Sequence, residues 1–73
     1  MEPQEIKISD DYITLSQLLK LTNIFESGGF IKSYVNEEGV FVNEEPEFRR
    51  GRKLYPEDIV KLKTGEVFIV KTE

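Results

Sequence analysis

The sequence predicts an α+β fold in which a pair of helices packs on a small, mostly antiparallel sheet with a C-terminal hairpin. Three observations carry this prediction: apolar residues alternate with polar ones near the N-terminus, recur at helical spacing through residues 14–37, and alternate again after residue 58. Of the 73 residues, 38% are hydrophobic and 33% are charged, so the chain is apolar enough to fold. We expect residues 1–73 to form one domain with a thin core, because a chain this short buries only about 60% of its unfolded surface.

The first element is predicted to be a strand over Glu5 to Ser9, in which Ile6 and Ile8 point to the buried face. A helix should follow, because Thr14 and Gln17 have the spacing of a capping box. Its core stripe consists of Leu15, Leu18, Leu19 and Thr22, with Lys20 turned away.

A connector from Asn23 to Glu26 comes next, in which Ile24 and Phe25 are expected to fill the gap between two helices. Ser27 is a candidate N-cap for the second helix, which we expect to run to about Glu37. The core face of this helix is predicted to carry Ile31, Tyr34 and Val35, with Phe30 at its margin.

Gly39 should end the second helix, and Val40 to Val42 form a short strand. Residues 43–46 and 56–58 have turn composition. The last segment is predicted to be a hairpin of strands 59–63 and 66–71 that reverses at Thr64-Gly65. A two-residue loop would pair Leu62 with Val67 and Val60 with Ile69, whereas a one-residue bulge would shift this register.

Charge is concentrated in one place, because the run 49–53 carries four cations in five residues of a chain whose formal net charge is -4. We interpret Arg49, Arg50, Arg52 and Lys53 as a site for an extended anion, with nucleic acid the first candidate. Arginine offers a planar fork to phosphates, and Gly51 allows the backbone to come close to a ligand. The alternative is a solvated loop whose cations pair with nearby carboxylates.

The start of the second helix is a further candidate anion site. Gly28 and Gly29 are costly inside a helix, and they lie on the same side as Lys32 and Asn36. Free amides at the positive end of a helix dipole, beside a lysine, suit a phosphate. The alternative is that the glycines allow close helix packing, and Glu26 would repel an anion there.

Aromatic residues flank the basic run. Phe48 and Tyr55 could stack on unpaired bases, but the interpretation we favour places them in the core. Tyr12 and Phe68 are assigned to the core outright.

The absence of cysteine and histidine excludes disulfides, the usual zinc ligands, a thiol nucleophile and an imidazole base. No catalytic arrangement of the remaining groups is recognisable, so we expect no enzyme, no cofactor and no metal. No segment resembles a signal peptide or a membrane span, which predicts a cytoplasmic protein.

In order along the chain, SGGFIKSYV, GVFVN and RRGRKLYPEDIV resemble the S-four RNA-binding domain, the module named after ribosomal small-subunit protein four. The short stand-alone YaaA-type members are similar from end to end. The family's helix motif is matched by Ser27 and Lys32, its strand end by Val40, Val42 and Asn43, and its later turn by Leu54, Asp58 and Ile59. Gly28 stands where the family usually has arginine, and Glu44 and Glu57 stand where it usually has glycine.

The resemblance implies the αL RNA-binding fold and a preference for structured RNA, with ribosomal RNA or a ribosome-assembly intermediate as the partner. We therefore predict a monomeric, non-catalytic RNA-binding module. The predicted RNA-binding residues are Ser27, Gly28, Gly29, Lys32, Asn43, Arg49, Arg50, Gly51, Arg52 and Lys53.

Two other functions stay open from the sequence. The first is a protein-interaction module that docks a basic partner through an acidic face, formed by Glu37, Glu38, Glu44, Glu45 and Glu47. The second is a helix-turn-helix that binds DNA. We rank it low, because the presumed recognition helix pairs one cation, Lys32, with two acids, Glu37 and Glu38.

Overall fold

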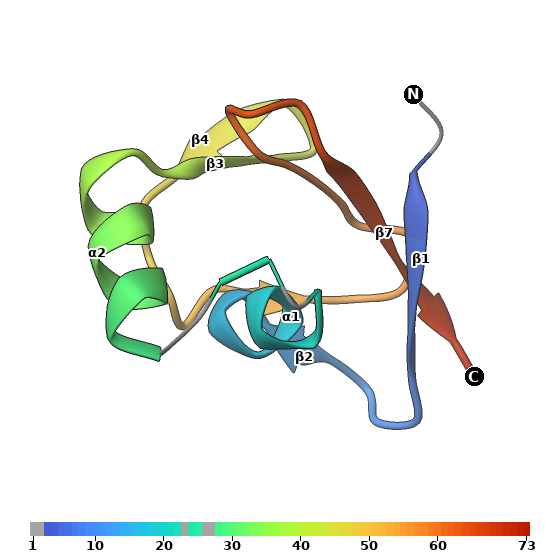
Figure 1. Cartoon of the computed structure of the whole chain (residues 1–73). Helices are drawn as coiled ribbons and strands as arrows, with labels where there is room; N and C mark the ends of the chain where they lie inside the picture. The colour runs from blue at the N-terminus through green and yellow to red at the C-terminus, as the bar shows by residue number, and fades with distance from the viewer. Residues whose placement is uncertain (1–2, 23, 26–27) are drawn as a thin grey trace.

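The computed structural model describes residues 3–22, 24–25 and 28–73, which include two helices and seven strands. A five-stranded sheet has the order β1-β7-β6-β3-β4, and a separate two-stranded ribbon joins β2 to β5. The helices lie on one side of the large sheet (Figure 1). The described strands pair antiparallel except β1 and β7, which are parallel. The predicted α+β class and the antiparallel C-terminal hairpin are confirmed.

The N-terminal predictions hold closely. Strand β1 spans Gln4–Ile8, with Ile6 and Ile8 buried. After the two-residue strand β2 (Ile13–Thr14), helix α1 spans Leu15–Leu21. The capping box is present: the Gln17 amide donates to Thr14 Oγ1 at 3.3 Å, and the Thr14 amide donates to Gln17 Oε1 at 3.0 Å. The three leucines of the predicted stripe are buried, whereas Thr22 is the C-cap and its hydroxyl donates to the Leu19 carbonyl.

Helix α2 spans Gly28–Glu37, so its predicted end is confirmed, whereas the Asn23, Glu26 and Ser27 predictions lie outside the described residues. Ile31 and Val35 are buried and Tyr34 is half-buried. In the connector, only half of the prediction holds. Phe25 packs against the core and lies beside Tyr34 of α2, with their ring centroids 5.1 Å apart, whereas Ile24 is exposed.

The predicted turn over residues 43–46 is shorter than expected. Strand β3 (Val40–Val42) pairs with β4 (Glu45–Glu47), so residues 43–44 alone form the turn. Asn43 and Glu44 have φ of 50° and 73°, as both central positions of a type I′ hairpin require. Pro46 is tolerated in β4 because this strand lies at the sheet edge, where an absent amide donor costs no ladder bond.

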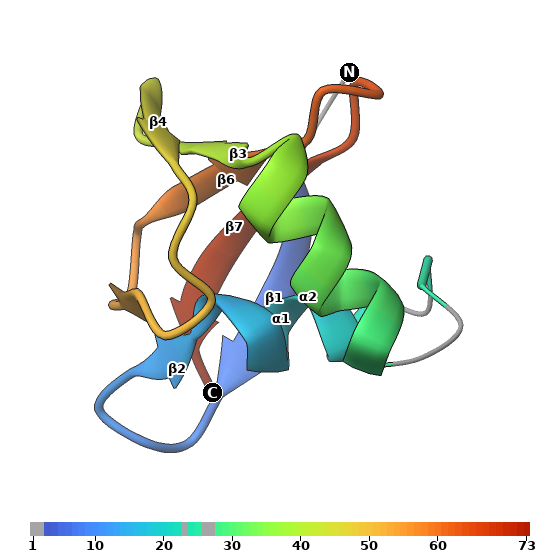
Figure 2. The ribbon, with the colours of Figure 1, turned by 90° about the vertical axis from the view of Figure 1, so that its left-hand side faces the viewer.

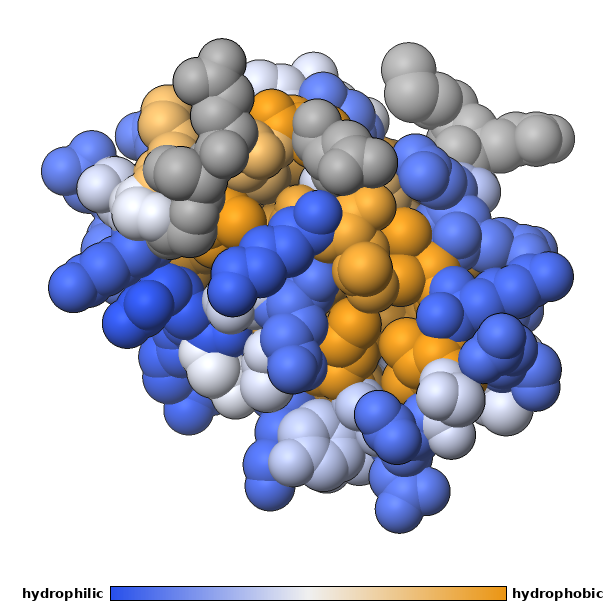
Figure 3. Space-filling view, turned by 60° about the horizontal axis from the view of Figure 1, so that its bottom comes forward, coloured by the Kyte–Doolittle hydropathy of each residue, from blue (hydrophilic) through white to orange (hydrophobic). Residues whose placement is uncertain are grey.

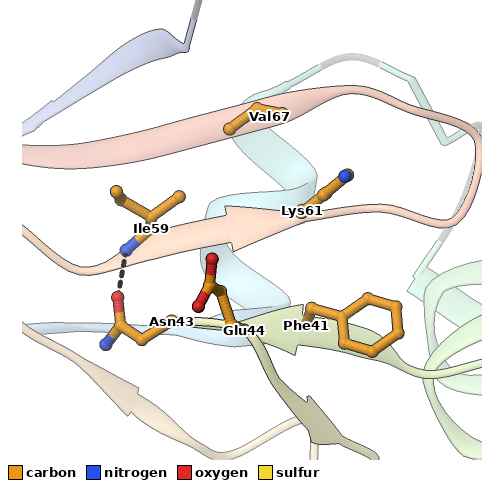
Figure 4. A pocket seen from close by; sticks show the side chains of 6 residues that line it. All are labelled: Phe41, Asn43, Glu44, Ile59, Lys61 and Val67. Atoms are coloured by element: carbon orange, nitrogen blue, oxygen red, sulfur yellow. Dashed lines mark hydrogen bonds between the residues drawn. The ribbon is translucent and has the colours of Figure 1, made fainter.

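Asn43 fixes this turn against the next strand. Its side-chain Oδ1 accepts from the Ile59 amide at 2.9 Å (Figure 4). Its Nδ2 donates to Asp58 Oδ1 at 3.1 Å. Figure 4 also shows Phe41, Ile59 and Val67 lining a hollow on the outer face of the sheet with Lys61. Asn43 therefore joins the β3–β4 hairpin to the start of β6.

Glu44 has a side chain where the left-handed backbone favours glycine. A non-glycine residue in this region costs roughly 1–2 kcal/mol, so we expect Glu44→Gly to raise the unfolding free energy by about 1 kcal/mol. Thermal denaturation followed by circular dichroism should show a gain of roughly 4–8 °C. Glu44→Ala removes the same carboxylate but keeps Cβ, and an equal gain from it would contradict the backbone explanation.

The C-terminal hairpin has the bulged register, not the two-residue loop. Strands β6 (Ile59–Lys61) and β7 (Val67–Thr72) pair Val60 with Phe68, one residue away from the two-residue prediction. The cause is a loop of residues 63–65, closed by a bond from the Leu62 amide to the Glu66 carbonyl, in which Gly65 has φ of 108°. A one-residue shift reverses the faces. Phe68 and Val70 are consequently buried, and Val67 and Ile69 are only half-buried.

The two-residue strand β5 (Lys53–Leu54) is not predicted by the sequence, whereas the turn that follows it agrees with the prediction. Glu57 in that turn has φ of 79°, which explains why glycine suits the position. The buried apolar side chains of both helices, the large sheet and the β2–β5 ribbon form one cluster. Within the described residues, neither helix is long and apolar enough to cross a membrane.

Candidate nucleic-acid interface

Residues 49–52 of the basic run lie in the connection between β4 and β5, which passes close to the start of α1 (Figure 2), and Lys53 is the first residue of β5. The amides of Leu15 and Ser16, in the first turn of α1, donate to the carbonyls of Arg52 and Arg50 at 2.9 and 3.0 Å. Helix amides that lack a partner within their own helix thus hold the loop. Its backbone is anchored to the core through α1.

Glu47 fixes the other side of this loop. Its Oε2 accepts from the amides of Phe48 and Arg49 at 3.1 and 3.2 Å, and from Arg49 Nε at 3.0 Å. Its Oε1 accepts from Arg49 Nη2 at 3.1 Å and from Arg52 Nη1 at 2.7 Å. The residue is only 6% exposed. We call this group of Glu47, Arg49 and Arg52 the carboxylate clamp.

The clamp controls the ionisation of Glu47. Hydrogen bonding from Arg49 is the main cause that lowers the pKa of Glu47 from 4.5 to about 2, and the Arg52 bond adds to it against the opposing effect of burial. The same contact raises the pKa of Arg49. The carboxylate is therefore ionised at every pH near neutrality.

The structure divides the four cations of the run into two kinds. Arg49 and Arg52 are ion-paired with Glu47, as the solvated-loop alternative expected for such cations. Arg50 and Lys53 form no ion pair with the residues that the structure describes. The Arg49 side chain stays 76% exposed despite its bond. One carboxylate offsets one of four positive charges, so the loop keeps three.

Two hollows adjoin this loop, and the charged residues that line them are all cations. One, of about 530 Å³, is lined by Arg49, Gly51, Arg52, Lys53 and Tyr55. The other, of about 440 Å³, is lined by Thr14, Ser16, Asn36, Phe48, Arg49, Arg50 and Gly51. By contrast, the hollow between β1 and α1 mixes Lys7 and Lys20 with Asp10 and Glu73 around apolar side chains. Figure 3 shows the face at the bottom of Figure 1, on which apolar side chains gather among hydrophilic ones.

Helix α2 reaches the basic loop through Asn36, which lines the second hollow. Lys32 is exposed and precedes Asn36 by four residues, so both lie on the same side of α2. Gly28 and Gly29 form the first turn of α2. The structure thus brings the Lys32 side of α2 beside Arg49 and Arg50.

Asn43 is not part of this group. It lies in the turn at one end of the β3–β4 hairpin, whereas the basic run follows β4 at the other end. Its side chain already bonds Asp58 and the Ile59 amide. Its contact with RNA stays a prediction.

The aromatic assignments were largely wrong. Phe68 is buried, but Tyr12, Phe48 and Tyr55 are 40%, 49% and 48% exposed. Aliphatic side chains fill most of the core, and these three residues lie at the periphery, on or beside the basic run. Phe48 covers Gly39, where a Cβ would lie 2.7 Å from the ring.

Sequence reasoning also missed the role of Glu47. The sequence predicts that Glu47 lies on an acidic docking face with Glu44 and Glu45, but it is buried whereas those two are exposed. Because Val40 pairs with Glu47, the carboxylate points to the same side as a core valine. No local signal distinguishes it from the neighbouring glutamates.

The two helices, the mixed sheet and the anchored basic loop define a small α+β module with a cationic surface. The S4 domain family model matches residues 6–71, so this chain belongs to the S4 domain family. The chain is also 49% identical, over 57 residues, to the "Probable ribosome maturation protein RlbA" of Bacillus subtilis (strain 168). That match covers 78% of this chain and 80% of the relative. The resemblance seen in the sequence is confirmed.

Proposed function

We propose that this chain is a non-catalytic module that binds structured RNA, and that its target is ribosomal RNA or a ribosome-assembly intermediate. Membership of the S4 domain family and the name of the Bacillus relative, which refers to ribosome maturation, support a ribosome-related role. The same proposal places the protein in the cytoplasm as a monomer. It needs no cofactor or metal.

The observation that carries this proposal is the anchored cationic loop. Ordering a free loop costs roughly 1–2 kcal/mol for each residue, and such a cost weakens binding. Here the α1 amides and the carboxylate clamp fix the loop before RNA arrives. The three remaining charges are therefore presented on a fixed surface.

We propose that Lys32, Arg49, Arg50, Arg52 and Lys53 contact phosphates, while Gly28, Gly29 and Gly51 allow close approach of the backbone. Gly51 supports this assignment, because a Cβ built there would meet no atom within 4 Å. Packing inside the protein therefore does not require glycine at this position. Ser27 and Asn43 stay predicted contacts.

Affinity should fall steeply with salt, because cations that neutralise phosphates release counterions. Glu47 offsets one of these five positive charges, so about four net charges neutralise phosphates, which predicts a log-log slope of roughly -3 to -3.5. Filter binding of a labelled, structured ribosomal RNA fragment between about 50 and 200 mM KCl measures this slope. A DNA duplex of matching length is the control for RNA preference, and a flat salt profile would contradict the proposal.

A further inference from the structure

The β2–β5 ribbon presents two tyrosines side by side next to the basic loop. Ile13 pairs with Leu54 and Thr14 with Lys53, so the next antiparallel partners are Tyr12 and Tyr55. Ile13 and Leu54 are buried. Because side chains alternate along a strand, Tyr12, Lys53 and Tyr55 share the opposite, outer face.

The geometry of this group is that of an open aromatic platform. The ring centroids of Tyr12 and Tyr55 are 6.0 Å apart, with the planes inclined at 49°. Lys53 Nζ lies 5.0 Å from the Tyr12 centroid, so its charge covers one side of that ring. Tyr55 is 48% exposed against 40% for Tyr12, so its ring is the more open of the two for a ligand to stack on.

The backbone beneath Tyr55 is fixed in advance. Its amide donates to Asp58 Oδ2 at 2.8 Å, and its carbonyl accepts from the Asp58 amide at 2.9 Å. Phe48, by contrast, lies against Gly39. Tyr55 is thus the better-placed platform of the two aromatics that flank the basic run.

Cations face the same space as this platform. Tyr55 lines the 530 Å³ hollow together with Arg49, Gly51, Arg52 and Lys53. A nucleotide needs a flat apolar surface for its base and a cation for its phosphate a few ångströms away. Both are present here, because Tyr55 directly follows β5 and the cations belong to β5 and to the loop that leads into it.

We propose that this hollow binds one unpaired nucleotide of the RNA, with the base stacked on Tyr55, Tyr12 supporting the ring from the side, and Lys53 and Arg52 holding the phosphate. This inference rests on the proposed RNA-binding function. It adds that the target carries an unpaired base, in a bulge or a loop, next to the helical part that the other cations contact.

The test compares three labelled RNAs: a fully paired hairpin, the same hairpin with one bulged uridine, and the bulged hairpin with an abasic site in place of that uridine. We expect the wild-type protein to bind the bulged hairpin roughly 5- to 100-fold more tightly than the other two, as stacking of one base allows. Tyr55→Leu should lose this preference, while its affinity for the paired hairpin stays within about twofold. Tyr55→Phe keeps the ring and should retain the preference.

Tyrosine fluorescence gives a direct readout, because the chain has three tyrosines and no tryptophan. Addition of the bulged hairpin should quench this emission more than addition of the abasic one, and the difference should vanish in Tyr55→Leu. Equal wild-type affinity for the bulged and abasic hairpins would overturn this inference and leave the proposed function intact. If Tyr55→Leu lost the same affinity for all three RNAs, the substitution would have disturbed the structure and not base stacking, and this result would also overturn the inference. Absence of salt-dependent binding to any of them would overturn both.

Discussion

A Glu47→Gln protein should lose about 2 kcal/mol of unfolding free energy and bind RNA several-fold more weakly, although the substitution adds one net positive charge. The carboxylate accepts five hydrogen bonds, two of them from backbone amides and three from guanidinium groups. Bonds to a charged partner contribute roughly 1.5–3 kcal/mol each, and a neutral amide recovers only part of this. The expected fall in melting temperature is roughly 8–16 °C.

The effect on RNA affinity separates two physical explanations. If net charge alone determined binding, Glu47→Gln would bind RNA more tightly than the wild type. If the fixed loop determines binding, affinity falls, because the cost of ordering the loop is then met during association. Glu45→Gln is the matched control: it makes the same charge change two residues away at an exposed position and should leave stability nearly unchanged.

The clamp also predicts how stability depends on pH. The folded pKa of Glu47 is lowered to about 2, so its contribution is fully present above about pH 4.5 and is lost as pH falls toward 2. The full pKa shift corresponds to a contribution of at most about 3 kcal/mol to the free energy of unfolding, and solvent around Arg49 reduces this contribution. Urea denaturation at several pH values should therefore show that the unfolding free energies of the wild type and Glu47→Gln become equal at low pH. If the two unfolding free energies differed by the same amount from pH 5 to pH 2, that result would contradict the role of the clamp.

Arg50→Glu should weaken RNA binding by roughly 10- to 100-fold and leave the unfolding free energy within about 0.5 kcal/mol of the wild type. Arg50 forms no ion pair with the described residues, so its reversal removes a phosphate contact without breaking the fold. Arg52 is a poorer choice, because its reversal would also break the clamp. The salt slope should become shallower by about 1, as expected for one lost contact.

The matched control for Arg50→Glu is Lys63→Glu. Lys63 is exposed in the β6–β7 loop, and its reversal changes net charge by the same amount. If both variants weakened RNA binding equally, overall charge and not the basic loop would attract the RNA. Docking of a basic protein through the acidic face would instead survive both substitutions. These outcomes separate RNA binding from the protein-interaction alternative.

Local features of the fold could be predicted from the sequence, because interactions between residues close together in the chain determine them. The capping box of Thr14 and Gln17 forms as its spacing indicates, and the leucine stripe of α1 is buried. Gly39 ends the second helical segment with φ of 74°, which glycine adopts without strain.

The register of the C-terminal hairpin shows where such prediction stops. Both the two-residue loop and the bulged loop satisfy the alternating pattern, and they differ only in which face each residue takes. Burial of Phe68 selects the bulged form, because this bulky ring gains more from the core than Val67 would. Packing against the rest of the sheet, which no local pattern specifies, made that choice.

The sequence by itself determined both helices, the strands β1, β3, β6 and β7, the family and the concentration of cations in residues 49–53, since periodicity and composition are properties of residues close together in the chain. The short strands β2, β4 and β5 were not predicted, because two or three residues carry too little pattern. Only the tertiary structure decided that Glu47 joins Arg49 and Arg52, and that Tyr12 lies beside Tyr55. The first depends on which face of β4 packs inward, and the second on pairing between β2 and β5, which are far apart in the chain. Contacts of this kind arise from folding of the whole domain, because burial of a shared core fixes which distant strands meet and in which register.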